Sequence, residues 1–274
     1  MSPASNIHSL LGRLLPAAIM PVERSLNRRQ RLSTGVGLPV NGVQCALVQR
    51  FDAGDDLHSV YRDLRSAALH GDVAALTDLG WAWLNGKYWR ADPLLANHLL
   101  RMAALQGCAT AWFNLGQQYY FGKGVDIAYA SAAAYYRHAF ECGMTHAAAA
   151  LGDLYEEEVC DGDQSWSVDP TAAYRWFLRG AEQGDARCQF EVGYRLLHGV
   201  QVPVDPATGL YWLERASTAG VVQAAEELAL HFSRRNAARY RHWREQAIGL
   251  GSRRVVGMGM DDQAGGVRAP GNFR

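Results

Sequence analysis

The stretch DVAALTDLGWAWLNGKYWRADPLLANHLLRMAALQG, residues 72–107, decides the fold, because it returns four more times in altered form. Each copy carries a leucine–glycine pair or a variant of it, which we call the anchor pair: Leu79-Gly80, Leu115-Gly116, Leu151-Gly152, Val192-Gly193 and Leu228-Ala229. The anchors are separated by 36, 36, 41 and 36 residues, so the third copy contains five extra residues. Self-similarity at such a period predicts a helical solenoid.

One copy reads as two helices, A and B, followed by a closing glycine. Four residues before each anchor lies a small residue, and four after it a large one, so helix A has a face that runs small, leucine, large. Glycines after helix A suit a left-handed C-cap, at Gly86, Gly122 and Gly199. Aspartates suit the N-cap of helix B, at Asp92, Asp126, Asp169 and Asp205.

These residues follow the pattern A-x-x-x-L-G-x-x-x-Y, a loop with glycine, then D-P-x-x-A-x-x-W/Y-x-x-x-A-A-x-x-G, which resembles the Sel1-like repeat family of tetratricopeptide-like proteins. Residues 72–107, 108–143 and 144–184 match it well, 185–220 match with Cys188 and Val192 substituted, and 221–251 are degenerate. The resemblance implies an all-α superhelix of about five helical hairpins that serves protein–protein contact.

Charge and composition divide the chain into segments. Residues 1–35 carry a net charge of +4, residues 51–230 carry −11 and residues 231–274 carry +6. We expect a disordered basic tail over 1–40, a capping half-repeat over 41–71, the repeat solenoid over 72–251 and a disordered C-terminal tail over 252–274.

The sequence favours a reducing, cytoplasmic location. The apolar stretch SLLGRLLPAAIMPV near the N-terminus is interrupted by Arg13, which makes a poor secretory signal, and it is too short to span a bilayer. The five cysteines lack a disulfide-like spacing, and Cys188 occupies the small core position of its helix A.

No catalytic residue, metal site or cofactor is predicted. His138, Cys142 and His146 are four residues apart, but Gly143 closes a repeat between them, so they do not form one helical face. Motifs for metalloproteases, serine hydrolases and nucleotide-binding loops are absent from the sequence.

The predicted binding surface is the concave wall, which is the inner side of the superhelix. Related superhelices build this wall from helix-A positions outside the face that carries the anchor leucines. These positions carry polar and aromatic residues that suit an interface: Trp81, Phe113, Gln117, Tyr120, Asp153, Glu156, Arg187, Phe190 and Tyr194. The alternative is that the rings pack beneath neighbouring repeats. The insertion in the third repeat, EEEVCDGDQSWSVD, supplies a second candidate contact through Trp166, or is a solvated loop.

We therefore expect a non-enzymatic scaffold or adaptor that binds a peptide or protein of unknown identity. One alternative is a dedicated inhibitor of a single toxin or enzyme, of the kind that immunity proteins represent. Another is nucleic-acid binding through the basic segment SRRNAARYRHWREQA. Against nucleic-acid binding, we expect Ala238, Trp243 and Ala247 to pack inward and the arginines to form the polar outer face of a terminal repeat.

Overall fold

The computed structural model describes residues 11–19, 49–50, 54–157, 159–161 and 164–255. The chain forms two compact units, Met1–Trp176 and Phe177–Arg274, and each is described by itself. Among the described residues the fold is all-α apart from one short β-hairpin, in agreement with the predicted repeat of helical hairpins.

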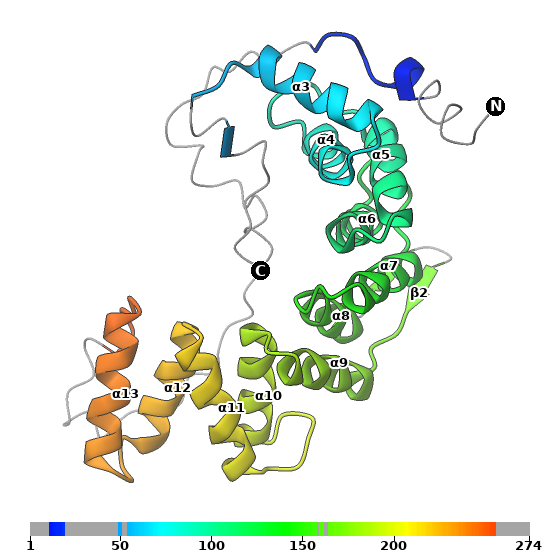
Figure 1. Cartoon of the computed structure of the whole chain (residues 1–274). Helices are drawn as coiled ribbons and strands as arrows, with labels where there is room; N and C mark the ends of the chain where they lie inside the picture. The colour runs from blue at the N-terminus through cyan, green and yellow to red at the C-terminus, as the bar shows by residue number, and fades with distance from the viewer. Residues whose placement is uncertain (1–10, 20–48, 51–53, 158, 162–163, 256–274) are drawn as a thin grey trace. The chain divides into compact units, whose positions relative to one another are not determined.

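The N-terminal unit is a stack of helices joined by short turns (Figure 1). Its helices are α3 (Leu57–Leu69), α4 (Val73–Asn85), α5 (Pro93–Leu105), α6 (Ala109–Phe121), α7 (Tyr129–Glu141) and α8 (Ala147–Glu156). Helices α4, α6 and α8 are the A helices of the first three repeats, and α5 and α7 are B helices. Within this unit each B helix packs on the A helix before it and on the A helix after it.

The C-terminal unit repeats this arrangement. Helix α9 (Pro170–Glu182) is the third B helix, and the division between the units falls within it. It is followed by α10 (Ala186–His198), α11 (Pro206–Thr218), α12 (Val222–Phe232) and α13 (Ala237–Gly249). The degenerate fifth repeat therefore does form a helical pair, α12 with α13.

Helix ends follow the expected capping chemistry with one exception. The carboxylates of Asp92 and Asp205 accept hydrogen bonds from the amides of Leu95 and Thr208, and Asp169 does the same for Ala172. The prediction for Asp126 is wrong: α7 begins at Tyr129, with Ala128 as N-cap and no side-chain hydrogen bond. The three predicted C-cap glycines are all left-handed, with φ between 59° and 71°.

The anchor glycines let helix B approach helix A closely. A Cβ atom on Gly116 would lie 2.5 Å from ring carbons of Tyr136, and one on Gly80 would lie 2.7 Å from Leu100 Cγ. Both neighbours are buried, so their side chains have little room to move. The glycine of the leucine–glycine pair is therefore a packing requirement of the hairpin.

We expect Gly116→Ala to lower the free energy of unfolding by about 1–3 kcal/mol, because the added methyl group overpacks the α6–α7 contact. Gly249→Ala is the matched control, since a Cβ atom added to that helical glycine would meet no neighbouring group within 4 Å. It is expected to leave stability unchanged or raise it by up to about 1 kcal/mol. Chemical denaturation of both variants checks this, and equal effects would refute the close-packing role.

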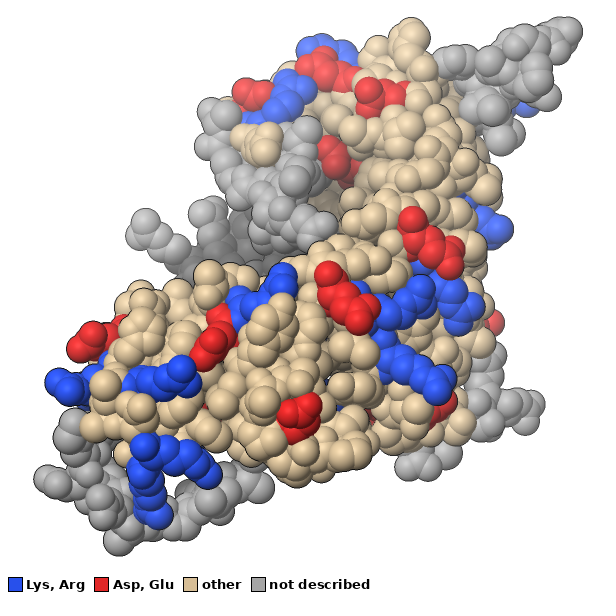
Figure 2. All heavy atoms as spheres, turned by 60° about the horizontal axis from the view of Figure 1, so that its bottom comes forward, with Lys and Arg blue, Asp and Glu red and all other residues tan. Residues whose placement is uncertain are grey.

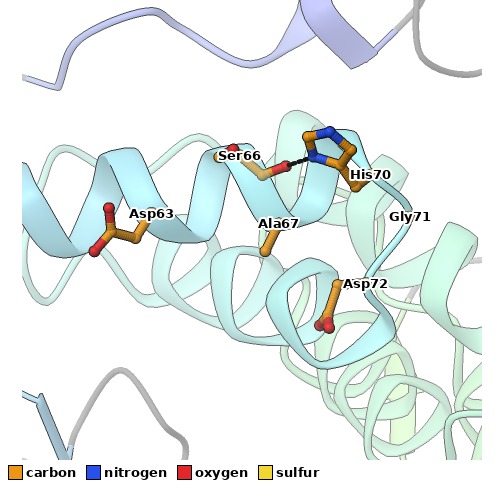
Figure 3. A pocket seen from close by; sticks show the side chains of 6 residues that line it. All are labelled: Asp63, Ser66, Ala67, His70, Gly71 and Asp72. Carbon is orange, nitrogen blue, oxygen red and sulfur yellow. Dashed lines mark hydrogen bonds between the residues drawn. The ribbon is translucent and has the colours of Figure 1, made fainter.

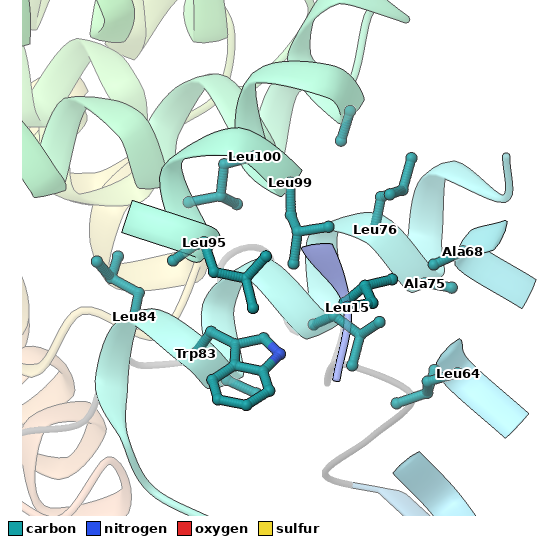
Figure 4. Packing of buried hydrophobic residues seen from close by; sticks show 14 of the residues in the cluster. Leu15, Leu64, Ala68, Ala75, Leu76, Trp83, Leu84, Leu95, Leu99 and Leu100 are labelled. Atoms are coloured by element: carbon teal, nitrogen blue, oxygen red, sulfur yellow. The ribbon is translucent and has the colours of Figure 1, made fainter. Parts of the chain in front are cut away.

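The core of the N-terminal unit is a continuous apolar cluster between α3, α4, α5 and the residues that precede them (Figure 4). Its largest fully buried side chain is Trp89, in the turn between α4 and α5. The Trp89 ring lies 5.3 Å from Tyr61 and 5.4 Å from Trp83, measured between ring centroids. The turn thus contributes to the core together with the helices that it joins.

The insertion in the third repeat forms a β-hairpin, with β1 (Val159–Asp161) antiparallel to β2 (Gln164–Trp166). Trp166 pairs in register with Val159. The indole Nε1 of Trp166 donates a hydrogen bond of 2.7 Å to the carbonyl of Leu154. That carbonyl lies in the last turn of α8, where carbonyls lack a helical partner, so Trp166 caps the helix.

The structure differs from the expected disordered tails at two places. Leu11, Leu15 and Ile19 are buried in the core of the N-terminal unit. At the other end, Val255 is buried, and the Ser252 hydroxyl donates to the Glu226 carboxylate at 2.5 Å. The remaining tail residues, and most of residues 41–53 of the predicted capping half-repeat, lie outside the described residues.

Candidate functional site

Three consecutive A helices present half-buried side chains at equivalent positions. Trp81, Gln117 and Asp153 each follow their anchor leucine by two residues, on α4, α6 and α8. Tyr120 and Glu156 follow theirs by five residues and are also half-buried. We call these five residues the helix-A surface. They are the part of the predicted wall that belongs to the N-terminal unit and is accessible there.

Side chains near the helix C-termini join these A helices. The Lys123 ammonium, just after α6, donates to Asn85 Oδ1 on α4 at 3.0 Å. The Tyr120 hydroxyl on α6 donates to the carboxylate of Glu157, just after α8, at 2.5 Å. These two bonds fix neighbouring repeats to one another along the edge of the helix-A surface.

The region around Tyr120 is acidic. Burial and the hydrogen bond to Glu157 raise the pKa of Tyr120, so its hydroxyl stays protonated and donating. The pKa of Tyr136 is raised by burial first and then by the nearby Tyr120 hydroxyl and the Asp153 and Glu157 carboxylates. With Glu156, the end of α8 carries three acidic side chains. This region favours cationic groups over anionic ones.

The other end of the helix-A surface is aromatic. The Trp81 ring lies 6.5 Å from Tyr88, and the Lys87 ammonium lies 5.9 Å from the Trp81 ring and 5.3 Å from the Tyr88 ring. Sequence reasoning selected Trp81 but missed Lys87 and Tyr88, which come from the turn after α4. An aromatic residue two positions beyond a C-cap glycine is the signal that could have found Tyr88.

Phe113 was predicted to lie on the binding wall, and the structure corrects this. Its side chain is 4% exposed and packs against Tyr136 at 5.2 Å and His146 at 5.8 Å, between ring centroids. The position two residues before the anchor faces the following repeat, because His146 is the N-cap of the next A helix. Phe113 is therefore a core residue and cannot act as an exposed anchor.

The C-terminal unit carries the other three predicted wall residues on α10. Phe190 and Tyr194 are half-buried with ring centroids 5.9 Å apart, and Arg187 is exposed. Sequence reasoning missed His198, whose ring lies 4.5 Å from Tyr194 and whose Nε2 is 3.1 Å from the Glu227 carboxylate on α12. Phe190 also packs against the core of this unit, so its role is partly structural.

Trp166 is positioned by the helix that it caps. Besides its bond to Leu154, its ring lies 5.2 Å from Tyr155, and the side chain is half-buried. The insertion is thus attached to the end of α8, next to Glu156 and Glu157. Any contact of Trp166 with a partner would be made from this fixed position at the end of α8.

The arginines of the last repeat gather at the end of the C-terminal unit (Figure 2). Arg239 lies over the Phe232 ring at 5.0 Å, and Arg244 Nε donates to the Val255 carbonyl at 3.1 Å. Tyr240 and Ala247 face inward, while Ala238, which was predicted to do so, is exposed. Arginines that cover rings and carbonyls fit the predicted polar outer face of a terminal repeat.

A shallow pocket lies between the end of α3 and the start of α4, lined by Asp63, Ser66, Ala67, His70, Gly71 and Asp72 (Figure 3). Three of its polar side chains have partners. Asp72 accepts from the Ala75 amide at 2.7 Å, Asp63 pairs with Arg50 at 3.0 Å, and His70 Nδ1 lies 2.7 Å from the Ser66 carbonyl. These contacts serve the turn between the helices.

The three residues weighed as a metal site do not form one helical face. His138 lies on α7 beside Glu141, exposed Cys142 caps that helix, and His146 is the N-cap of α8. Among the described residues, no three histidine, cysteine or acidic side chains come together in a way that could hold a metal ion.

Cys188 is buried in α10, which confirms its predicted core position. In the part of the chain that the structure covers, no helix is both long and apolar enough to cross a membrane.

Comparison with known proteins identifies the repeat. The model of the Sel1 repeat matches four times, at residues 73–108, 110–144, 145–185 and 186–221. These matches correspond to the hairpins from α4 to α11, and the α12–α13 pair continues the same arrangement.

A curated relative and two solved structures show the same similarity. Chitin synthase regulatory factor 4 of Schizosaccharomyces pombe is 33% identical over 140 residues, which is 51% of this chain but only 21% of the yeast protein. A Sel1 repeat protein from Oxalobacter formigenes superposes with a TM-score of 0.60 at 25% identity, over 73% of this chain and 84% of that one. A protective antigen of uropathogenic Escherichia coli superposes with a TM-score of 0.58 at 24% identity, over 74% and 45%.

Proposed function

The chain belongs to the Sel1 repeat family, and we propose that it is a scaffold or adaptor that binds a peptide or protein segment on the helix-A surface. Sel1 repeats generally mediate protein–protein interaction and the family is non-catalytic. The yeast relative is by its name a regulatory factor, which fits a binding role.

The observation that carries the proposal is the run of half-buried side chains at equivalent positions of α4, α6 and α8. Aromatic rings that are partly exposed to solvent bury a large apolar area when a partner covers them, and they are typical anchors of protein interfaces. The B helices that pack between these A helices hold the repeats in place, and the exposed hydrogen bonds at Lys123 and Tyr120 add contacts between neighbouring repeats. The surface is therefore preorganised, and little ordering is needed on binding.

The chemistry of the surface selects the partner. Trp81 and Tyr88 favour an apolar or aromatic side chain, while Asp153, Glu156 and Glu157 favour lysine or arginine. The excess of acidic residues over 51–230 would attract such a segment at longer range. The proposed ligand is therefore a protein segment with basic residues beside an apolar anchor.

Selection of peptides from a random display library on the full-length protein tests this proposal. We expect the selected peptides to lose about thirtyfold in affinity for Trp81→Ala, the effect of losing an interface anchor worth about 2 kcal/mol. The melting temperature is expected to fall modestly while the variant remains folded, because the half-buried Trp81 ring packs against the edge of the core and its removal costs part of that contact.

The matched control is Tyr211→Ala, which removes a ring that is 51% exposed on α11 and is not one of the residues of the helix-A surface. It is expected to leave both affinity and stability unchanged. Selected peptides that bind Trp81→Ala as well as they bind the unchanged protein would show that the ligand uses another surface.

A further inference from the structure

The segment from Leu11 to Ile19 packs on the first helices of the N-terminal unit. Residues 11–14 form a helical turn, in which the Leu15 amide donates to the Leu11 carbonyl at 2.8 Å. Leu11, Leu15 and Ile19 are only 1%, 1% and 5% exposed, whereas Leu14 is 37% exposed. The segment therefore buries one row of apolar side chains that are four residues apart, and leaves its other side in solvent.

The surface beneath the segment is formed by apolar side chains of α3 and α4, and we call this surface the groove. Figure 4 shows Leu15 among Leu64 of α3 and Ala75 and Trp83 of α4. All of these side chains belong to the same buried cluster. The segment thus completes the apolar cluster of α3 and α4.

Two side chains of α3 recognise the backbone of the segment. The Tyr61 hydroxyl donates to the Pro16 carbonyl at 2.7 Å, and Arg65 Nη2 donates to the Leu15 carbonyl at 3.2 Å. Pro16 disfavours helical conformation at Leu15, so the helical turn ends here and leaves carbonyls without helical partners. Tyr61 and Arg65 donate hydrogen bonds to these carbonyls. Such an arrangement of donors suits the C-terminal end of a short helix.

We propose that this groove, formed by Tyr61, Leu64, Arg65, Ala75 and Trp83, is a peptide-binding site, and that residues 11–19 occupy it as an intramolecular ligand. The segment joins α3 only through residues 20–56, so its contacts with α3 and α4 are non-local in sequence. The site is separate from the helix-A surface and does not depend on its proposed function. Its ligand is a short helix with apolar residues four apart that ends at a proline.

The test uses the full-length chain and a labelled synthetic peptide of residues 9–21. In a Leu11→Asp/Leu15→Asp variant, buried charges prevent docking of the segment and leave the groove open. We expect this variant to remain folded and to bind the peptide in a fluorescence anisotropy titration. The unchanged protein is expected to bind the peptide about 100-fold more weakly, because its own tethered segment competes at an effective concentration on the order of 1 mM.

Two further variants make the result specific. Leu14→Asp changes the exposed neighbour and is expected to bind the peptide as weakly as the unchanged protein does. Adding Tyr61→Phe to the double variant removes the hydrogen bond to the Pro16 carbonyl and is expected to weaken peptide binding by about three- to tenfold.

Three outcomes would overturn the proposal. If the double variant loses the cooperative melting of the helices, followed by circular dichroism, the segment is an integral part of the core. If the folded double variant does not bind the peptide, the groove is not a peptide-binding site. If the unchanged protein binds the peptide as tightly as the double variant does, the peptide binds elsewhere.

Discussion

Phe113→Ala is expected to lower the free energy of unfolding by about 3–5 kcal/mol, the usual cost of removing a buried aromatic ring from a core. The ring is 4% exposed and is enclosed by Tyr136 and His146, so its removal leaves a cavity between two repeats. Urea denaturation followed by circular dichroism measures the change.

Phe121→Ala is the matched control, because this ring lies on the same helix and is 58% exposed. Its truncation is expected to change the free energy of unfolding by about 0.5 kcal/mol or less. A small effect of Phe113→Ala, similar to that of the control, would contradict the burial of Phe113 and return it to the candidate interface.

Trp89→Ala is expected to cost a similar amount, about 3–5 kcal/mol. Trp89 is fully buried and holds together the rings of Tyr61 and Trp83, which come from α3 and α4. Loss of the ring would therefore loosen the first repeat and the helix that caps it. Thermal and chemical denaturation of the variant check this.

Trp89→Phe separates packing from hydrogen bonding. The buried Nε1 of Trp89 has no hydrogen-bond partner among the described residues, so replacing the indole with a phenyl ring removes no hydrogen bond. We expect a loss of about 1–3 kcal/mol, smaller than that of Trp89→Ala, because the phenyl ring fills part of the volume of the indole. If Trp89→Phe were as damaging as Trp89→Ala, the account of Trp89 as a packing residue would be wrong.

The repeat pattern predicted most of the fold because the anchors report local packing. Leu115 and Gly116 mark the contact of helix A with helix B, and Gly86 and Gly122 end their helices in the left-handed conformation that their type favours. Asp126 failed as a cap because its sequence position alone did not show that α7 begins after Ala128. Capping depends on where the helix begins, which is set by packing of the whole hairpin.

The candidate site was less predictable, because helices of a solenoid are covered on more than one side. Trp81 and Phe113 both lie two positions from an anchor leucine, one after it and one before it, and only the second faces the next repeat. Periodicity along one helix cannot distinguish these sides. The docking of Leu11 and Leu15 on α3 was equally inaccessible, since it joins segments that are far apart in the sequence.

The most direct test of the proposed function is the effect of the acidic side chains on a selected peptide. The affinity of the peptide for the unchanged protein would be compared, at low salt, with its affinity for the Asp153→Asn/Glu156→Gln variant. We expect the selected peptides to be basic and to bind the variant about tenfold more weakly, an effect of about 1–2 kcal/mol from two partly exposed ion pairs. This difference is expected to shrink as the salt concentration rises. Selection of neutral or acidic peptides, or equal affinity for the two proteins at low salt, would contradict the binding of a basic segment on the helix-A surface.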